Sequence, residues 1–180
     1  MKQARSTDEK CPESHEIRGS SSPAFLLAQV GAHAASKFAE RLRELELTPA
    51  HAGIVRILGA TPGLTQQALA NALGSLPSRL VALVDELEAK GLLERLSDNE
   101  DRRRYALRLT EKGMATLPSI GRIAREHQQR LLAALSEEER RQLAILLQRV
   151  ANEQGLMRSV HPGYGGSLPQ QNVKHLRRPQ

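Results

Sequence analysis

The strongest candidate for a chemical role in this 180-residue chain is a run of three consecutive arginines. Arg102, Arg103 and Arg104 follow Asp101 in a polar run that begins at Ser97. Guanidinium groups bind phosphate, and the negative potential of the DNA minor groove attracts them. Taken alone, a charge run of this kind favours a solvated loop over a binding site. Its meaning therefore depends on the elements that carry it.

Other chemistries have less support in the sequence. The single cysteine, Cys11, excludes an internal disulfide and a multi-cysteine zinc site. His33, His51 and His127 lack metal-ligand spacing such as HExxH. No set of nucleophile, base and orienting group can be assembled, and no glycine loop is suited to cradle a phosphate. We therefore expect a protein that is not an enzyme and that holds no metal or cofactor.

The charge is unevenly distributed. The chain carries 26 basic against 20 acidic residues, a net charge of +6, but residues 155–180 contribute +4 and residues 23–154 only +2. Global basicity is therefore weak support for nucleic-acid binding. We expect a flexible polar tail over 1–22 and a basic flexible tail over 155–180. Only four aromatic residues occur, too few for modules that stack single-stranded bases.

No membrane or secretion segment is apparent in the sequence. No apolar run approaches the roughly 18 residues of a membrane span. The N-terminus lacks the apolar stretch of a signal peptide. We expect a soluble cytoplasmic protein without a membrane partner.

Most of the region between the two tails has helical periodicity, because its apolar residues recur every three to four positions. Four positions suit helix N-caps, namely Thr48, Thr65, Thr110 and Ser136. Gly91 suits the left-handed residue that closes a helix. The predicted helices cover about 24–46, 49–61, 65–73, 77–90, 110–135 and 136–153.

The charged run lies between two short apolar stretches, 92–96 and 105–109, which predict a β-hairpin with the arginines at its tip. The short helix over 65–73, a turn containing Gly74 and the longer helix over 77–90 form a helix-turn-helix, and a hairpin directly after it makes a wing. A helix fits the DNA major groove, and an Arg-bearing loop can enter the neighbouring minor groove. The predicted fold class is mostly α with a small β-hairpin wing.

Four stretches, in order and correctly spaced, carry a family pattern. They are Leu47-Thr48-Pro49, LTQQALA at 64–70, LEAKGLLER at 87–95 and DRRRYALRLTEKG at 101–113. With these residues the sequence resembles the MarR family of bacterial transcription regulators, and the last run is similar to the family's wing signature. The resemblance covers roughly three-quarters of the chain.

The resemblance implies a winged helix-turn-helix homodimer with six helices in residues 23–154. Its DNA-binding lobe would cover about 48–109, and its helical dimerisation region about 24–46 and 110–153. Two recognition helices would enter successive major grooves of a pseudo-palindromic double-stranded DNA site. Family members commonly repress transcription and release DNA when a small, often aromatic or phenolic, ligand binds between the dimerisation and DNA-binding lobes.

The residues expected to contact DNA belong to the third helix, the fourth helix with the turn before it, and the wing. They are Thr65, Gln66, Ser75, Pro77, Ser78, Arg79, Ala82, Arg95, Arg102, Arg103 and Arg104. Many family members carry Arg at the position of Ala82, and Arg79, one turn earlier on the same face, can take over that contact. Leu76 departs from the usual polar N-cap, so Ser75 is expected to cap the fourth helix instead.

Several of these assignments have a structural alternative. Thr65 and Gln66 could serve only to cap the third helix, and Arg95 could be a plain surface residue. By the family pattern, Asp101 pairs with Arg103 and rigidifies the wing. A solvated carboxylate is the alternative.

The sequence is less informative about an effector. His33 or His51 could line a ligand pocket, although an ordinary partly buried histidine explains each one better. Cys11 does not match the redox cysteine of peroxide-sensing family members, which directly precedes a Phe-Leu-Leu run where this chain has Ala24. The leading hypothesis is a homodimeric repressor released by a small ligand. The alternative is a winged-helix protein–protein interaction module without DNA binding, consistent with seven acids against seven bases in 76–108.

Overall fold

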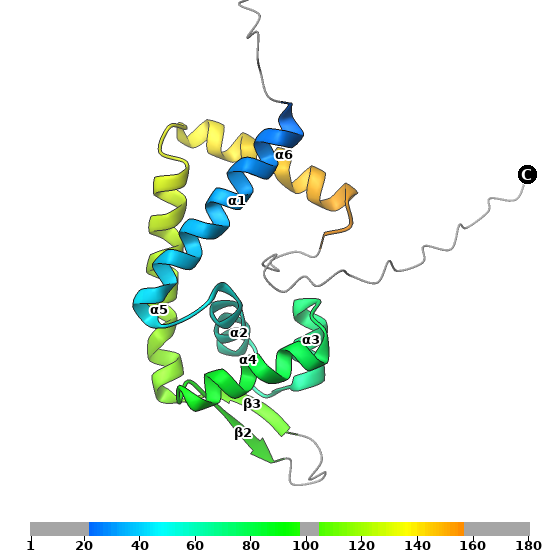
Figure 1. The fold of residues 1–180 in the computed structure, drawn as a ribbon, viewed down its shortest axis with the longest axis vertical. Coiled ribbons are helices and arrows are strands. Elements are labelled where there is room, and N and C mark those ends of the chain that lie inside the picture. The colour runs from blue at the N-terminus through cyan, green and yellow to red at the C-terminus, as the bar shows by residue number, and fades with distance from the viewer. Residues whose placement is uncertain (1–21, 98–104, 157–180) are drawn as a thin grey trace, which may run out of the picture.

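The computed structural model describes residues 22–97 and 105–156. Within them, six α-helices and three strands follow one another along the chain (Figure 1). The helices are α1 Pro23–Leu42, α2 Pro49–Ala60, α3 Gln66–Leu73, α4 Pro77–Ala89, α5 Glu111–Leu131 and α6 Glu137–Glu153. The strands are β1 Leu64–Thr65, β2 Leu93–Ser97 and β3 Tyr105–Leu109. The six predicted helices and the predicted hairpin strands are confirmed.

Two helices end earlier than their apolar periodicity predicts. α1 ends at Leu42, and a short 3-10 helix, η1 Arg43–Leu45, leads to Glu46, whose φ of 54° is left-handed. α5 ends at Leu131 rather than near 135. The spacing misleads after α1 because Leu45 still packs against the core although the α-helical hydrogen bonds have ended.

Side-chain caps define most of the helix starts, as predicted. At four of the predicted caps, a hydroxyl oxygen accepts a hydrogen bond from the backbone N–H three residues further on. These caps are Thr48, Thr65, Thr110 and Ser136. α4 differs, because Leu76 occupies its N-cap without a side-chain hydrogen bond. The expectation that Ser75 caps α4 was wrong, since its Oγ contacts the Leu76 carbonyl oxygen at 3.5 Å. Pro77 still suits the first turn, where no N–H is needed.

The three strands form one antiparallel sheet in the order β1-β3-β2. In the hairpin, Leu93 lies opposite Leu109 and Ser97 opposite Tyr105. The additional strand β1 was not predicted, because two residues are too few to show periodicity. Its pairing with β3 fixes the start of α3 beside the hairpin.

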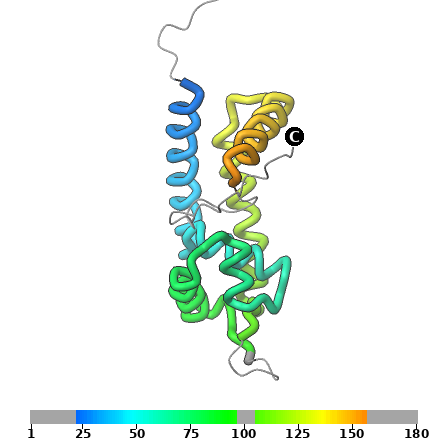
Figure 2. Tube along the Cα trace, turned by 90° about the vertical axis from the view of Figure 1, so that its right-hand side faces the viewer, coloured from blue at the N-terminus to red at the C-terminus, as the bar shows by residue number. Residues whose placement is uncertain are grey.

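The hydrophobic core lies where α2, α3 and α4 pack around the strands. Its largest fully buried side chains in this region are Ile54, Leu58, Leu69, Leu73, Leu80, Leu87, Leu93 and Leu107. α5 runs from beside the strands to α6 at the opposite end of the molecule (Figure 1). α1 and α5 pack against each other above this lobe. In the view turned by 90°, the start of α1 stands apart from α6 (Figure 2).

Some expectations concern parts of the chain that the structure does not describe. Cys11, Asp101 and the arginines Arg102, Arg103 and Arg104 lie outside the described residues. Within the described part, no helix combines the length and apolar character that crossing a membrane requires. The same part contains no cluster of three or more His, Cys, Asp or Glu side chains that could hold a metal ion.

Candidate nucleic-acid interface

Helices α3 and α4 are joined by a tight turn. Gly74 ends α3 in the left-handed region with φ 57°, a conformation that favours glycine. The Ser75 N–H donates to the Ala70 carbonyl oxygen at 3.0 Å and satisfies one acceptor at the helix end. The side of α4 that packs into the core carries Leu80, Val84 and Leu87. Because these residues are buried, the opposite side of α4 faces solvent.

The solvent side of α4 carries four of the residues predicted to contact DNA. Pro77, Ser78, Arg79 and Ala82 are exposed, and Ser75 in the preceding turn is half-buried. No side chain caps the helix start, so the positive end of the helix dipole is accessible and is reinforced by the Arg79 guanidinium. This combination attracts phosphate groups.

Thr65 and Gln66 connect α3 to the sheet. Thr65 Oγ1 accepts the Ala68 N–H at 3.2 Å, and Thr65 lies opposite Ala106 of β3. Both Thr65 and Gln66 are half-buried. Capping is therefore an observed role of Thr65, and DNA contact by either residue stays a prediction.

Arg95 on β2 has partners within its own lobe. Its guanidinium forms ion pairs with Asp85 and Glu88 of α4, and its side chain is 21% exposed. The pair of carboxylates joins the wing strand to the helix through a planar, two-sided contact that suits Arg. The observed role of Arg95 is therefore to hold the wing strand to α4, and its contact with DNA stays a prediction.

The paired strands β2 and β3 carry the wing. Arg108 Nε lies 3.2 Å from Glu94 Oε1 across the hairpin. The last observed pair is Ser97 opposite Tyr105, and the predicted contact residues at the tip lie between these two positions, outside the described residues. Their roles stay predictions.

The start of α5 is bound to the end of α4, and we call this contact the α4–α5 junction (Lys90, Gly91, Leu92, Thr110, Lys112 and Gly113). Thr110 Oγ1 donates to the Gly91 carbonyl oxygen at 2.7 Å, and Lys112 Nζ donates to the Lys90 carbonyl oxygen at 2.7 Å. These bonds satisfy carbonyl groups at the C-terminal end of α4. A Cβ at Gly113 would lie 2.0 Å from the Leu92 carbonyl oxygen, so the two backbones approach closely.

A pocket of about 390 Å³ lies between α1 and α5. Its lining consists of Gly31, Ala34, Ala35, Phe38, Ala124, His127 and Gln128. The Phe38 and His127 rings are tilted against each other with centroids 5.4 Å apart. Partial burial lowers the pKa of His127, and the nearby Arg41 and His33 lower it further.

The two histidines proposed from the sequence lie elsewhere. His33 is exposed on α1, close enough to His127 to act on it electrostatically but not part of the lining. His51 is buried between α2 and α4, where its ring contacts Glu86. The pocket histidine is therefore His127, which no spacing rule singled out.

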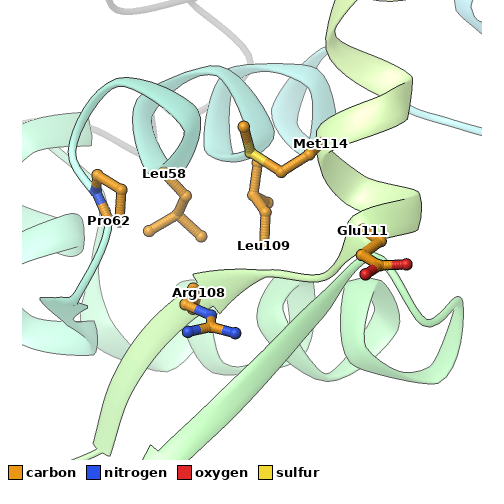
Figure 3. Close-up of a pocket in the computed structure, with 6 residues that line it drawn as sticks. All are labelled: Leu58, Pro62, Arg108, Leu109, Glu111 and Met114. Atoms are coloured by element: carbon orange, nitrogen blue, oxygen red, sulfur yellow. The ribbon is translucent and has the colours of Figure 1, made fainter.

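A second pocket, of about 460 Å³, lies between α2, β3 and the start of α5. Its lining consists of Leu58, Pro62, Arg108, Leu109, Glu111 and Met114 (Figure 3). Apolar side chains surround the hollow, and the charged ends of Arg108 and Glu111 point away from its centre. It is thus a largely apolar hollow on the lobe that carries the wing.

Comparisons with known proteins identify the family. A family model described as MarR family matches residues 45–104. A Thauera aromatica protein, described as a candidate transcriptional regulatory protein for the hcr operon, is 37% identical over 115 residues, which are 63% of this chain and 69% of that protein. The chain belongs to the MarR family.

Solved structures agree with this MarR-family assignment. The S. aureus MepR–DNA complex has a TM-score of 0.65 at 27% identity, over 74% of this chain and 99% of that chain. The transcriptional repressor CouR bound to a 23-mer DNA duplex has a TM-score of 0.65 at 33% identity, over 72% and 92%. A mutant of E. coli MarR complexed with operator DNA has a TM-score of 0.63 at 25% identity, over 71% and 91%. The predicted winged helix-turn-helix fold is confirmed.

Membership of the MarR family fixes the broad class of activity. MarR-family proteins are transcriptional regulators and not enzymes. Family membership therefore confirms the prediction that this protein is not an enzyme. Ala82 and Arg79 both lie exposed on α4, with Arg79 in its first turn. The expectation that Arg79 takes over the contact of an arginine at position 82 stays a prediction.

Proposed function

We propose that this MarR-family protein is a homodimeric repressor that binds a pseudo-palindromic DNA site and releases it when a small aromatic ligand binds. The observation that carries the proposal is the exposed, uncapped start of α4 with Arg79, held next to the paired strands of the wing. The DNA complexes of MepR, CouR and E. coli MarR support it, since these chains share the fold.

The proposed contacts fall into two groups. Ser75, Pro77, Ser78, Arg79 and Ala82 place α4 in the major groove, where N–H groups and Arg79 meet phosphates or base edges. Thr65 and Gln66 contact the adjacent phosphates from α3.

The wing contributes the remaining contacts. Arg102, Arg103 and Arg104 enter the neighbouring minor groove, where the potential is most negative. By family resemblance, Asp101 orients Arg103. Arg95 contributes to DNA binding indirectly, because its ion pairs with Asp85 and Glu88 hold the wing strand to α4.

Dimerisation is proposed to occur through the helices remote from the wing. Large apolar side chains that stay exposed in the single chain include Phe25, Leu26, Leu27 and Val30 of α1 and Ile145, Leu146, Leu147 and Val150 of α6. The start of α1 and α6 both lie at the end of the molecule opposite the wing (Figure 1). Apolar surface of this extent marks an interaction site. A monomeric mass by light scattering at micromolar concentration would contradict this architecture.

The effector site is proposed to be the pocket between α1 and α5. Phe38 and His127 provide two ring faces, while Gly31, Ala34 and Ala35 leave room beside them. A flat aromatic or phenolic molecule can stack on these rings and meet a hydrogen-bonding imidazole. Because α5 is also bound to α4 at the α4–α5 junction, a ligand that moves α5 shifts the recognition helix.

The experiment that tests this function is selection of genomic DNA fragments with the purified full-length protein. Recovered duplexes are then challenged with a panel of benzoates and phenols. We expect enrichment of fragments with half-sites about 10 base pairs apart, centre to centre, and release by members of the panel. Absence of any retarded duplex at low salt would favour the protein–protein interaction module instead.

A further inference from the structure

His51 occupies a position where a titratable ring is unusual, the third residue of a buried helix start. Its side chain is 2% exposed. Its backbone N–H donates to Thr48 Oγ1 at 3.2 Å, and the Thr48 N–H donates back to His51 Nδ1 at 3.3 Å. The two residues therefore form a capping box, a role that Glu or Gln usually fills at this position. His51 thus fixes the start of α2.

The other ring nitrogen of His51 faces the recognition helix α4. His51 Nε2 lies 3.0 Å from Glu86 Oε2. The atom is fully buried and has no hydrogen-bond partner among the described residues. Its short distance to the Glu86 carboxylate makes this a close electrostatic contact. Since Nδ1 accepts a hydrogen bond, the neutral ring carries its proton on Nε2, directed at Glu86.

Protonation of the His51 ring would break the hydrogen bond on its Nδ1 side. The added proton sits on Nδ1, where it faces the Thr48 N–H donor, so the capping box loses one of its two hydrogen bonds. The charged groups that act on the ring are Glu86, which favours the cation, and Lys90, which opposes it, both on α4. Burial is the largest influence and lowers the pKa of His51, which keeps the ring neutral at neutral pH.

We propose that His51 is a pH-responsive positioning residue that fixes the start of α2 beside the recognition helix, through its capping box, only while its ring is neutral, so that acidification weakens DNA binding. The inference rests on the proposed function, because it uses α4 as the DNA-contacting helix. Glu86 lies seven residues after Arg79 on α4, which places both on the same side of the helix two turns apart. A change at Glu86 is therefore transmitted along a rigid helix to the contact surface.

The sign of the pH effect follows from proton linkage. A histidine whose pKa is lower in the folded protein binds fewer protons there than in the unfolded chain, so folding is favoured above the ordinary pKa of about 6.5 and loses stability as the pH falls below it. His127 contributes in the same direction, because burial and Arg41 lower its pKa too. A test must separate the two histidines.

Three variants make this separation. His51→Gln keeps the capping box, because its amide oxygen can accept the Thr48 N–H, but it does not titrate. Glu86→Gln keeps an acceptor beside the ring and removes the charge that favours its protonation; the Glu86 side chain is 56% exposed, so this variant is expected to fold. His127→Gln is the matched control for the other histidine with a lowered pKa.

The measured quantity is the dissociation constant of the full-length protein from the tightest duplex recovered in the genomic selection, determined by fluorescence anisotropy. The pH is varied between about 8 and 5.5, a range that spans the ordinary histidine pKa of about 6.5. Urea unfolding is followed at the same pH values. We expect the affinity of wild type relative to His51→Gln to fall on acidification by up to about tenfold per pH unit, the limit for one proton. Glu86→Gln should shift the onset to lower pH. His127→Gln should keep the fall in DNA affinity that His51→Gln removes, and should lose only its own part of the pH dependence of unfolding.

The failures are distinguishable. Equal pH profiles for wild type and His51→Gln, with both binding the duplex, would overturn the role of His51 and leave the proposed function intact. An unshifted onset in Glu86→Gln would overturn the electrostatic link to α4. If wild type binds no duplex at any pH, the proposed function fails, and this inference fails with it even if unfolding retains a His51-dependent slope.

Discussion

Thr110 Oγ1 donates a 2.7 Å hydrogen bond to the carbonyl oxygen of Gly91, which joins the N-cap of α5 to the left-handed residue after the C-cap of α4. Lys112 binds the preceding carbonyl oxygen in the same way. Because α5 also packs against α1, one helix connects the proposed dimerisation region to the proposed DNA contact. The α4–α5 junction is therefore the place where a change in α5 reaches α4.

The close backbone approach in this junction predicts a large effect of a single methyl group. Gly113→Ala would place a Cβ 2.0 Å from the Leu92 carbonyl oxygen, so the backbones must separate. We expect the free energy of unfolding to fall by about 1–3 kcal/mol. Gly31→Ala is the control, since nothing lies within 4 Å of a Cβ there and helical Ala is favoured over Gly. Urea unfolding of both variants checks this, and equal effects would contradict it.

The ion pairs of Arg95 predict a measurable link between the wing strand and α4. Double-mutant cycles with Arg95→Met combined with Asp85→Asn or Glu88→Gln should give a coupling free energy of about 0.2–1 kcal/mol per pair, because the groups are partly exposed. Arg95→Met should also weaken DNA binding, since the wing then loses its attachment to α4. Arg108→Met, which removes the exposed pair with Glu94, is the control. Unchanged stability and affinity in Arg95→Met would refute the link.

The solvent face of α4 predicts a specific loss in DNA affinity. Arg79→Ala should cost about 1–3 kcal/mol of binding free energy, roughly 5- to 150-fold in Kd. Arg141→Ala makes the same charge change on α6, where Arg141 pairs with exposed Glu138, and should leave affinity nearly unchanged. Anisotropy titrations with the selected duplex compare the two. A similar loss in both variants would indicate that only net charge matters.

The pocket between α1 and α5 predicts which side chains sense the effector. Phe38→Ala and His127→Gln should raise, by several-fold, the concentration of an active benzoate or phenol needed to release DNA, because each variant removes one ring face. Their DNA affinity without ligand should match wild type. Met114→Ala changes the other pocket (Figure 3) and should leave release unaffected. If Met114→Ala alone alters release, the effector binds there instead.

Local signals in the sequence were enough to predict the helices and the hairpin. Thr48, Thr65 and Thr110 act as caps as their positions indicate, and Gly91 takes the predicted left-handed conformation with φ 68°. These features depend on neighbours within a few residues, which a sequence displays directly. The 3-10 helix after Leu42 was not predicted, because apolar spacing indicates which residues are buried and not which hydrogen bonds they form.

Contacts between distant segments could not be predicted in the same way. The ion pairs of Arg95 with α4 and the pocket position of His127 depend on how the helices pack. His51 carried a weak local signal, three residues after Thr48, but His is not the usual capping-box partner. The exposed face of α4 was predictable because the apolar residues on its other side are periodic.

The proposed function requires α4 and the wing to grip neighbouring grooves of one duplex as parts of a dimer. This is measured by titrating a selected palindromic duplex with wild type and Arg103→Ala at several salt concentrations. We expect two chains per duplex, affinity that falls steeply with salt because phosphate contacts release counterions, and strongly weakened binding by Arg103→Ala. Binding by Arg103→Ala as tight as wild type would exclude the wing contact, and no retardation of the duplex at low salt would exclude DNA recognition by this surface altogether.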